Sequence, residues 1–125
     1  QILRLTTRLL SQAGYMVFPA TSVEEAMQVF SNENCKFHLI FSDVVLPDGS
    51  GIELVTWLLK LDPEVKILLS SGYADEKAQF SLIQEKGYFF LQKPYKVDAL
   101  LQKIKKILSM DKVKSAPEKK YVSVR

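Results

Sequence analysis

Three side chains with complementary chemistry each follow a short apolar run of the chain. They are a carboxylate, Asp43, a hydroxyl, Ser71, and an ammonium, Lys93. A carboxylate can attack phosphorus as a nucleophile. An ammonium can neutralise the oxygens of a phosphoryl group, and a hydroxyl can donate a hydrogen bond to one of them. The residue types therefore predict phosphoryl transfer to Asp43, provided that the fold brings the three side chains together.

The apolar runs that precede these residues are continuous rather than alternating, which is typical of strands buried on both faces. We expect strands at 15–18, 39–41, 66–70 and 89–91, and helices at 1–13, 22–32, 50–61, 75–86 and 97–110. This alternation predicts a doubly wound parallel α/β sheet with right-handed crossovers. Ligands of such sheets collect at the carboxyl ends of the strands, so Asp43, Ser71 and Lys93 are expected at one edge.

The ends of the expected helices carry recognisable signals. Capping boxes at Ser22–Glu25 and Ser50–Glu53 start two of the helices. Gly14 is expected to end the first helix in the left-handed conformation, and the helix at 75–86 is expected to end at Gly87.

Composition indicates an ordinary globular domain. The chain has 125 residues, of which 47% are apolar and 25% are charged. The single cysteine, Cys35, cannot form an internal disulfide. No apolar run approaches the roughly 20 residues of a membrane span, and no signal peptide opens the sequence. We therefore expect a cytoplasmic domain without membrane contact.

The net charge of +3 is confined to the end of the chain. Residues 111–125 carry the whole excess, so residues 1–110 are neutral. Because a nucleic-acid module should present a basic face, we expect no nucleic-acid binding by this domain. The plainer interpretation divides the chain into a domain at 1–110 and a basic tail or linker at 111–125.

Taken together, the segments that carry the reactive residues resemble the receiver domain of two-component response regulators. The segments are DVVLPDGSG at 43–51, SSGY at 70–73 and FLQKPY at 90–95. The resemblance runs from residue 1 to about 110 and is closest to receivers at the C-terminal end of hybrid sensor histidine kinases. It implies a flavodoxin-like sheet in the order 2-1-3-4-5 with helices on both faces.

The resemblance also implies partners and residue roles. Asp43 would accept a phosphoryl group from a histidine kinase or phosphotransfer domain, in the presence of Mg²⁺, and a homodimer is also compatible with it. Val45 would offer its backbone carbonyl to the metal, and Ser71 would be the switch hydroxyl. Lys93 would be the charge partner of the phosphate, with a cis Lys93-Pro94 bond, and Phe90 would take the aromatic switch position.

One departure from the family pattern bears on the site. The family's first strand, and the acidic pair that follows it, are missing from this sequence, so Asp43 lacks most of the expected metal ligands. Either the strand is absent, in a natural pseudo-receiver or in a chain cut at that point, or the segment 121–125 takes its place. In the latter arrangement Arg125 would lie near Asp43.

Two further interpretations of function follow. The first is a phosphorylation-independent interaction module with an idle acidic pocket. A more remote one is a small hydrolase that uses Asp43 as its nucleophile, for which the sequence offers no second acid or base. His38 has no partner at metal-ligand spacing and is expected to be structural.

Overall fold

The computed structural model describes residues 2–33, 37–72, 77–109 and 120–124. The helices are α1 (Ile2–Gln12), α2 (Val23–Asn32), α3 (Gly51–Leu61), α4 (Lys77–Lys86) and α5 (Val97–Ser109). The strands are β1 (Met16–Ala20), β2 (Leu39–Asp43), β3 (Val45–Leu46), β4 (Gly49–Ser50), β5 (Lys66–Ser71), β6 (Phe89–Gln92) and β7 (Lys120–Val124). The expected helices and the four expected strands are therefore confirmed within a few residues.

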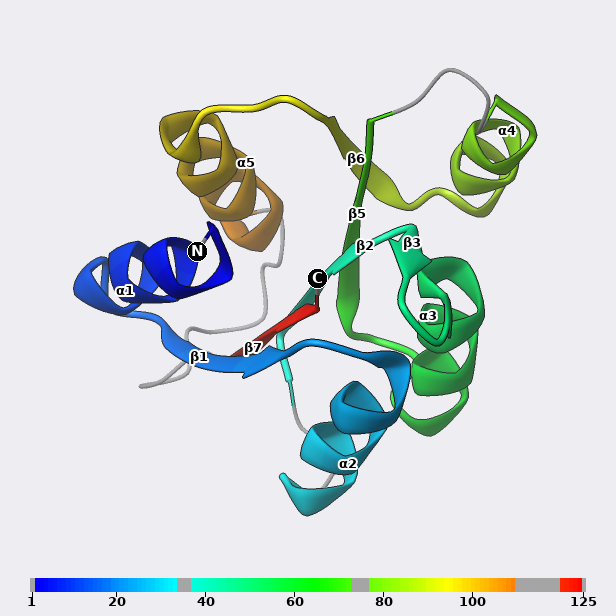
Figure 1. The fold of residues 1–125 in the computed structure, drawn as a ribbon, viewed down its shortest axis with the longest axis horizontal. Coiled ribbons are helices and arrows are strands. Elements are labelled where there is room, and N and C mark those ends of the chain that lie inside the picture. The colour runs from blue at the N-terminus through cyan, green and yellow to red at the C-terminus, as the bar shows by residue number, and fades with distance from the viewer. Residues whose placement is uncertain (1, 34–36, 73–76, 110–119, 125) are drawn as a thin grey trace.

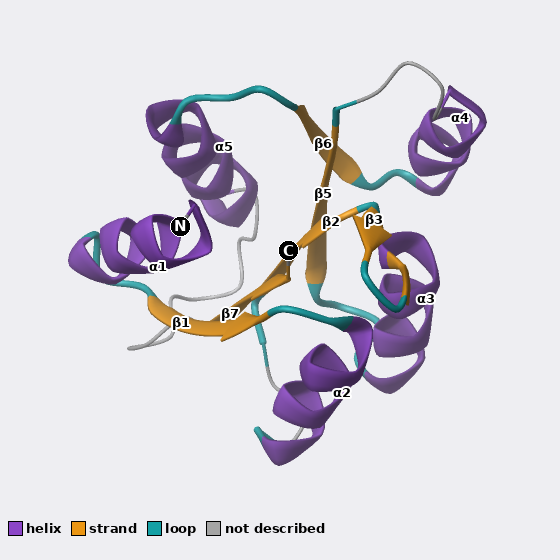
Figure 2. Cartoon of the chain, viewed as in Figure 1, coloured by secondary structure: helices purple, strands orange, loops and turns teal. Residues whose placement is uncertain are grey.

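Five of the strands form one parallel sheet in the order β1-β7-β2-β5-β6 (Figures 1 and 2). Among the described residues, the two helices α1 and α5 cover one face, and α2, α3 and α4 lie on the other. The alternation of apolar runs and helical patterns along the chain thus produces the doubly wound α/β architecture that the sequence predicts.

The central position between β1 and β2 is occupied by the last strand in the sequence, β7. Its residue Val122 is in register with Phe18 of β1 and with Ile40 of β2. Of the two arrangements that the sequence left open for the end of the chain, the structure has the inserted strand. Arg125 and the segment 110–119 lie outside the described residues, so the expected position of Arg125 beside Asp43 is not described.

The sheet separates two apolar clusters. Phe41 and Leu68 pack with α1 and α5 on one side, and their neighbours Ile40 and Leu69 pack with α2, α3 and α4 on the other. Side chains of successive strand residues point to opposite faces, so the continuous apolar runs fill both clusters. Burial on both faces explains why these strands lack an alternating pattern.

Local signals start and end the helices as expected. The Ser22 hydroxyl accepts a hydrogen bond from the Glu25 N–H at 3.1 Å, and the Ser50 hydroxyl accepts one from the Ile52 N–H at 3.1 Å. Gly14 has a φ of 98°, a left-handed conformation that glycine adopts without strain. No helix among the described residues is long and apolar enough to cross a membrane.

Candidate functional site

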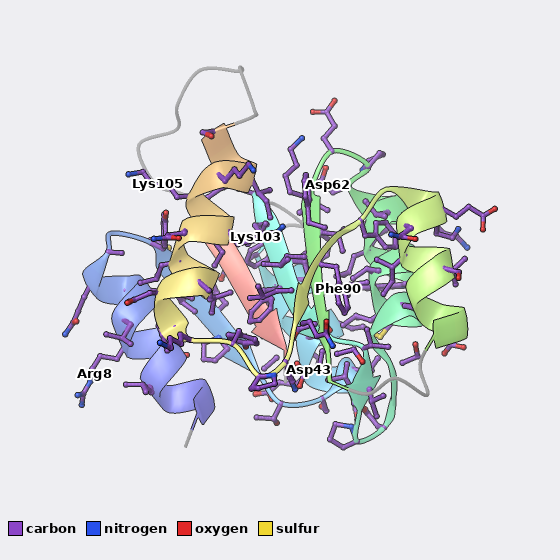
Figure 3. All side chains as sticks on the ribbon, turned by 90° about the horizontal axis from the view of Figure 1, so that it is seen from above. Arg8, Asp43, Asp62, Phe90, Lys103 and Lys105 are labelled. Atoms are coloured by element: carbon purple, nitrogen blue, oxygen red, sulfur yellow. The ribbon has the colours of Figure 1, made fainter. Side chains whose placement is uncertain are left out.

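Asp43 is the last residue of β2 and lies at the carboxyl edge of the parallel sheet. Figure 3 shows it at the opposite end of the strands from Asp62, which lies at the amino edge. Asp43 is only 9% exposed, in a strand whose other four residues are also buried. A carboxylate at this depth needs a charge partner, because burying an isolated ion is costly.

Lys93 supplies that partner. Its Nζ lies 3.0 Å from Asp43 Oδ2, and the two side chains are 34% and 12% exposed, respectively. The Lys93 N–H donates to the Ser71 carbonyl at 3.0 Å, which anchors the lysine to the end of β5. The expected cis peptide bond between Lys93 and Pro94 is present. The sequence prediction that Asp43 and Lys93 meet is therefore confirmed.

Two serines, Ser70 and Ser71, end β5, the strand that pairs with β2. Ser70 is in register with Asp43, and Ser71 is in register with Gln92 of β6. Both hydroxyl oxygens are buried without a hydrogen-bond partner among the described residues. A buried hydroxyl without a partner costs about 1–3 kcal/mol. A phosphoryl group on Asp43 that accepted a hydrogen bond from one of these hydroxyls would remove that cost.

The start of α3 packs against the backbone of Asp43 and fixes its position. Gly51 lies so close that a Cβ at this position would overlap the Asp43 carbonyl oxygen and meet Ser42 Oγ at 2.9 Å. The Gly51 N–H donates to the Val44 carbonyl at 2.7 Å. Ser42, which is fully buried, donates its hydroxyl to the Asp43 carbonyl at 2.8 Å. These contacts leave little freedom for the backbone that carries the carboxylate.

The segment after Asp43 is a short hairpin rather than the plain loop suggested by its turn residues. Strands β3 and β4 pair antiparallel, with Asp48 in the turn between them. The Asp48 carboxylate accepts hydrogen bonds from the N–H groups of Val23 at 2.8 Å and Glu24 at 3.2 Å. The Val23 hydrogen bond in particular lowers the pKa of Asp48 below its ordinary value, with a contribution from Glu24 and against an opposing effect of desolvation.

Local sequence patterns do not indicate the contacts that three residues make at the site, namely Asp48, Gly51 and Ser42. Nor do they indicate the register of Ser70 with Asp43. From their types alone, Asp48 and Gly51 are turn and loop residues. The sequence feature that marks Ser42 and Ser70 is a serine within an apolar run, at the next-to-last position of its strand. The polar residue interrupts the apolar pattern without ending the strand.

The remaining predicted residues are placed as follows. Phe90 lies on β6, half-buried against the cluster of α2, α3 and α4, and in register with Leu69. Val45 begins β3, two residues after Asp43, and its side chain is 62% exposed. His38 is half-buried just before β2, and its carbonyl accepts a hydrogen bond from the Lys66 N–H. Cys35 lies outside the described residues.

The described residues do not fit a complete Mg²⁺ site. Mg²⁺ requires several hard oxygen ligands in octahedral geometry, and no group of three potential metal-binding side chains occurs in the described part of the chain. Asp43 and the Val45 carbonyl would be the protein ligands, and the Asp43 carboxylate already forms an ion pair with the Lys93 ammonium. Strand β7 occupies the neighbouring position in the sheet, and residues 120–124 contain no acid.

Comparison with protein-family models gives a match over residues 1–105 to the model described as "Response regulator receiver domain". The matched region ends before β7. Four of the five strands in the main sheet, together with Asp43, Ser71 and Lys93, therefore lie inside it.

Curated relatives include a sensor kinase and a response regulator receiver protein, both from Brucella abortus. The chain is 32% identical over 101 residues to "Sensor kinase CckA", which covers 81% of this chain and 11% of that protein. It is 29% identical to "Response regulator receiver protein CpdR", covering 84% of this chain and 86% of that protein. The chain thus spans between about a tenth and a quarter of the length of several relatives, including transcriptional regulators.

Solved structures show the same fold. A CheY-like response regulator receiver domain protein from Methanospirillum hungatei aligns with a TM-score of 0.74 and 36% identity, covering 87% of this chain and 86% of that one. A response regulator receiver domain from Clostridium thermocellum aligns with a TM-score of 0.76, over 87% of this chain and 86% of that one, at 22% identity.

Proposed function

The chain belongs to the response regulator receiver domain family, whose members are signalling modules of two-component systems rather than enzymes, and from this premise we propose that Asp43 is its phosphoacceptor. The donor is the phosphohistidine of a histidine kinase or of a phosphotransfer domain. Phosphorylation then changes the conformation at the ends of β5 and β6. The observation that carries the proposal is the contact of Lys93 with Asp43 at the carboxyl edge of the sheet.

The chemistry follows from the atoms at this edge. A carboxylate oxygen of Asp43 attacks phosphorus, an O–P bond forms, and the P–N bond to the donor imidazole breaks with its electron pair passing to nitrogen. The Lys93 ammonium neutralises charge on the phosphoryl oxygens, which is the main protein contribution in a loose transition state. Ser71 can donate its buried hydroxyl, which has no other partner among the described residues, to one phosphoryl oxygen.

The switch that we propose is a shift between two packings. A new hydrogen bond from Ser71 to the phosphoryl group draws the end of β5 towards Asp43. Phe90 lies on the adjacent strand in register with Leu69, and it is half-buried. A movement of β5 therefore changes the space available to the Phe90 ring and alters the surface near β6.

A second candidate function is an interaction module that is not phosphorylated. The observation that favours it is the incomplete set of metal ligands. Among the described residues, no cluster of three or more potential ligand side chains could hold Mg²⁺. Mg²⁺ is the cofactor expected for the family, and no step above depends on it. In this alternative, the Asp43–Lys93 pair is a structural ion pair of the sheet edge.

Two measurements separate the candidates. Incubation with a phosphohistidine donor and Mg²⁺ is expected to label the chain, and Asp43→Asn is expected to abolish the label. Calorimetric titration with Mg²⁺ tests the second candidate, because binding at millimolar concentration that disappears in Asp43→Asn would contradict an idle pocket. Failure of labelling with an intact fold would favour the interaction module.

We further propose that the phosphohistidine donor belongs to a hybrid sensor kinase. The match to a sensor kinase over 81% of this chain supports this assignment, as does the sequence at 70–73 and 90–95. The assignment would be supported if the kinase core of a hybrid sensor kinase transferred its phosphoryl group to this domain much faster than to unrelated receivers. Equal transfer rates would contradict it.

A further inference from the structure

A groove with a volume of about 390 Å³ lies between α2 and α3. The two helices lie side by side on one face of the sheet (Figure 1). The volume falls in the lower part of the range of ligand and peptide pockets. None of the residues that line it takes part in the phosphoryl transfer proposed above.

The floor of the groove is apolar and packs against the core. Val23, Met27 and Trp57 line it, and all three are half-buried and packed against the core cluster. The Trp57 ring makes an edge-to-face contact with the buried Phe30 ring, with centroids 6.5 Å apart. A tryptophan and a methionine held by the core and open to a groove are typical anchors of a protein interface.

The rim of the groove is acidic. Glu24 and Asp48 line it, both are exposed, and no lysine or arginine is among the lining residues. Asp48 is engaged with the N–H groups at the start of α2, so the helix dipole partly offsets its charge. Glu24 has no ion pair among the described residues and is therefore the charge that remains available to a ligand.

We propose that this groove binds a basic amphipathic helix of a partner protein. An apolar face with anchors at helical spacing would lie on Met27 and Trp57, and a lysine or arginine beside it would reach Glu24. Helix-in-groove recognition uses apolar anchors of this kind. An acidic rim attracts a basic segment and repels an acidic one, which provides the specificity. The inference is independent of phosphorylation at Asp43.

Trp57 provides the measurement, because it is the only tryptophan in the sequence. The full chain is titrated with a capped amphipathic helical peptide built of leucine and lysine, and separately with a peptide in which glutamate replaces lysine. We expect a saturable change in Trp57 emission with the lysine peptide only. Binding of both peptides with similar affinity, or of neither, overturns the proposal.

Matched variants locate the binding. Glu24→Lys is expected to weaken the lysine peptide about tenfold or more, because an attraction at the rim becomes a repulsion. Glu85→Lys makes the same change of charge on an exposed residue of α4 and should leave affinity within about twofold. Equal losses in both variants would mean attraction to net charge alone and would overturn the proposal.

The apolar floor is tested in the same way. Met27→Gln should weaken the peptide, since it replaces an anchor, whereas Leu61→Gln changes an exposed leucine outside the groove and should not. Thermal unfolding of each variant verifies that the fold is retained. If Met27→Gln retains full affinity with an intact fold, the groove is not the binding surface.

Discussion

Gly51, the first residue of α3, packs directly against the backbone carbonyl of Asp43. A methyl group on its α-carbon would overlap that carbonyl oxygen. The Gly51 N–H also holds the Val44 carbonyl, so the start of the helix fixes the backbone on both sides of the peptide bond that follows Asp43. The position of the carboxylate thus depends on a residue that has no side chain.

We predict that Gly51→Ala displaces Asp43 and lowers the free energy of unfolding by about 1–3 kcal/mol, the usual effect of overpacking. Urea denaturation measures the stability, and backbone amide chemical shifts around Asp43 report the displacement. Gly87→Ala is the control. A Cβ there meets nothing within 4 Å, and the residue has a φ of 77°, so it should cost about 1–2 kcal/mol from backbone strain alone. Unchanged Asp43 shifts in Gly51→Ala would contradict this account.

Replacing Lys93 by glutamine should destabilise the fold through Asp43. The carboxylate is buried and would lose its charge partner, a loss of about 3–5 kcal/mol for fully buried pairs. Lys93 is about one-third exposed, so we expect a smaller loss of about 1–2 kcal/mol. The double variant Asp43→Asn/Lys93→Gln also removes the negative charge of Asp43 and should therefore recover part of the lost stability. Strictly additive effects in urea denaturation would mean that the pair contributes nothing.

The residues that meet at the site were predictable where local patterns decide the structure. Asp43 and Lys93 follow continuous apolar runs, and parallel strands place their carboxyl ends at one edge whatever the details of packing. The start of α2 was equally clear from Ser22 and Glu25. A capping box is recognisable in the sequence because its two residues lie only three positions apart.

The features that escaped prediction depend on contacts between distant segments. The Asp48 carboxylate accepts hydrogen bonds from the N–H groups of Val23 and Glu24, which lie 25 and 24 positions earlier in the chain. No local pattern encodes that pairing. Residues 120–124 have only a short alternating pattern. The sequence therefore leaves their insertion between β1 and β2 open as one of two arrangements, and pairing with these two distant strands decides between them.

Asp48 should contribute a pH-dependent part of the stability. Hydrogen bonds from the start of α2 lower its pKa in the folded state. The contribution is therefore fully present above the unfolded pKa, near the ordinary value of 3.8, and is lost as pH falls through the folded value. We expect Asp48→Asn to be less stable than the native chain at neutral pH and the difference to shrink in acid. Urea denaturation at several pH values measures this, with Glu85→Gln as the control. A constant difference between pH 7 and pH 2 would contradict the assignment.

Strand β7 should exchange its amide hydrogens slowly. Val122 is paired in register on both sides of the strand, and amides in a central strand exchange only through global opening. Hydrogen exchange followed by mass spectrometry is expected to protect residues 121–123 as strongly as β2. Exchange within seconds would show that the strand is not held in the sheet.

A proline at position 122 gives the complementary prediction. Val122→Pro removes a ladder donor from the middle of the sheet and leaves a carbonyl of a neighbouring strand without a partner. We expect a loss of about 1–3 kcal/mol in the free energy of unfolding, with weaker protection of β1 and β2. Unchanged protection of both neighbours would contradict the central placement of β7.

Mapping of the phosphoryl group tests the central claim most directly. The native chain, Asp43→Asn and Asp48→Asn are each incubated with a phosphohistidine donor and Mg²⁺, and the modified peptide is identified by mass spectrometry. Asp48 is the matched control because it is a second acid in the segment that follows Asp43. We predict modification of Asp43 in the native chain and in Asp48→Asn, and no modification in Asp43→Asn. An unmodified native chain, or equal modification of Asp43→Asn, would contradict the assignment of Asp43 as the phosphoacceptor.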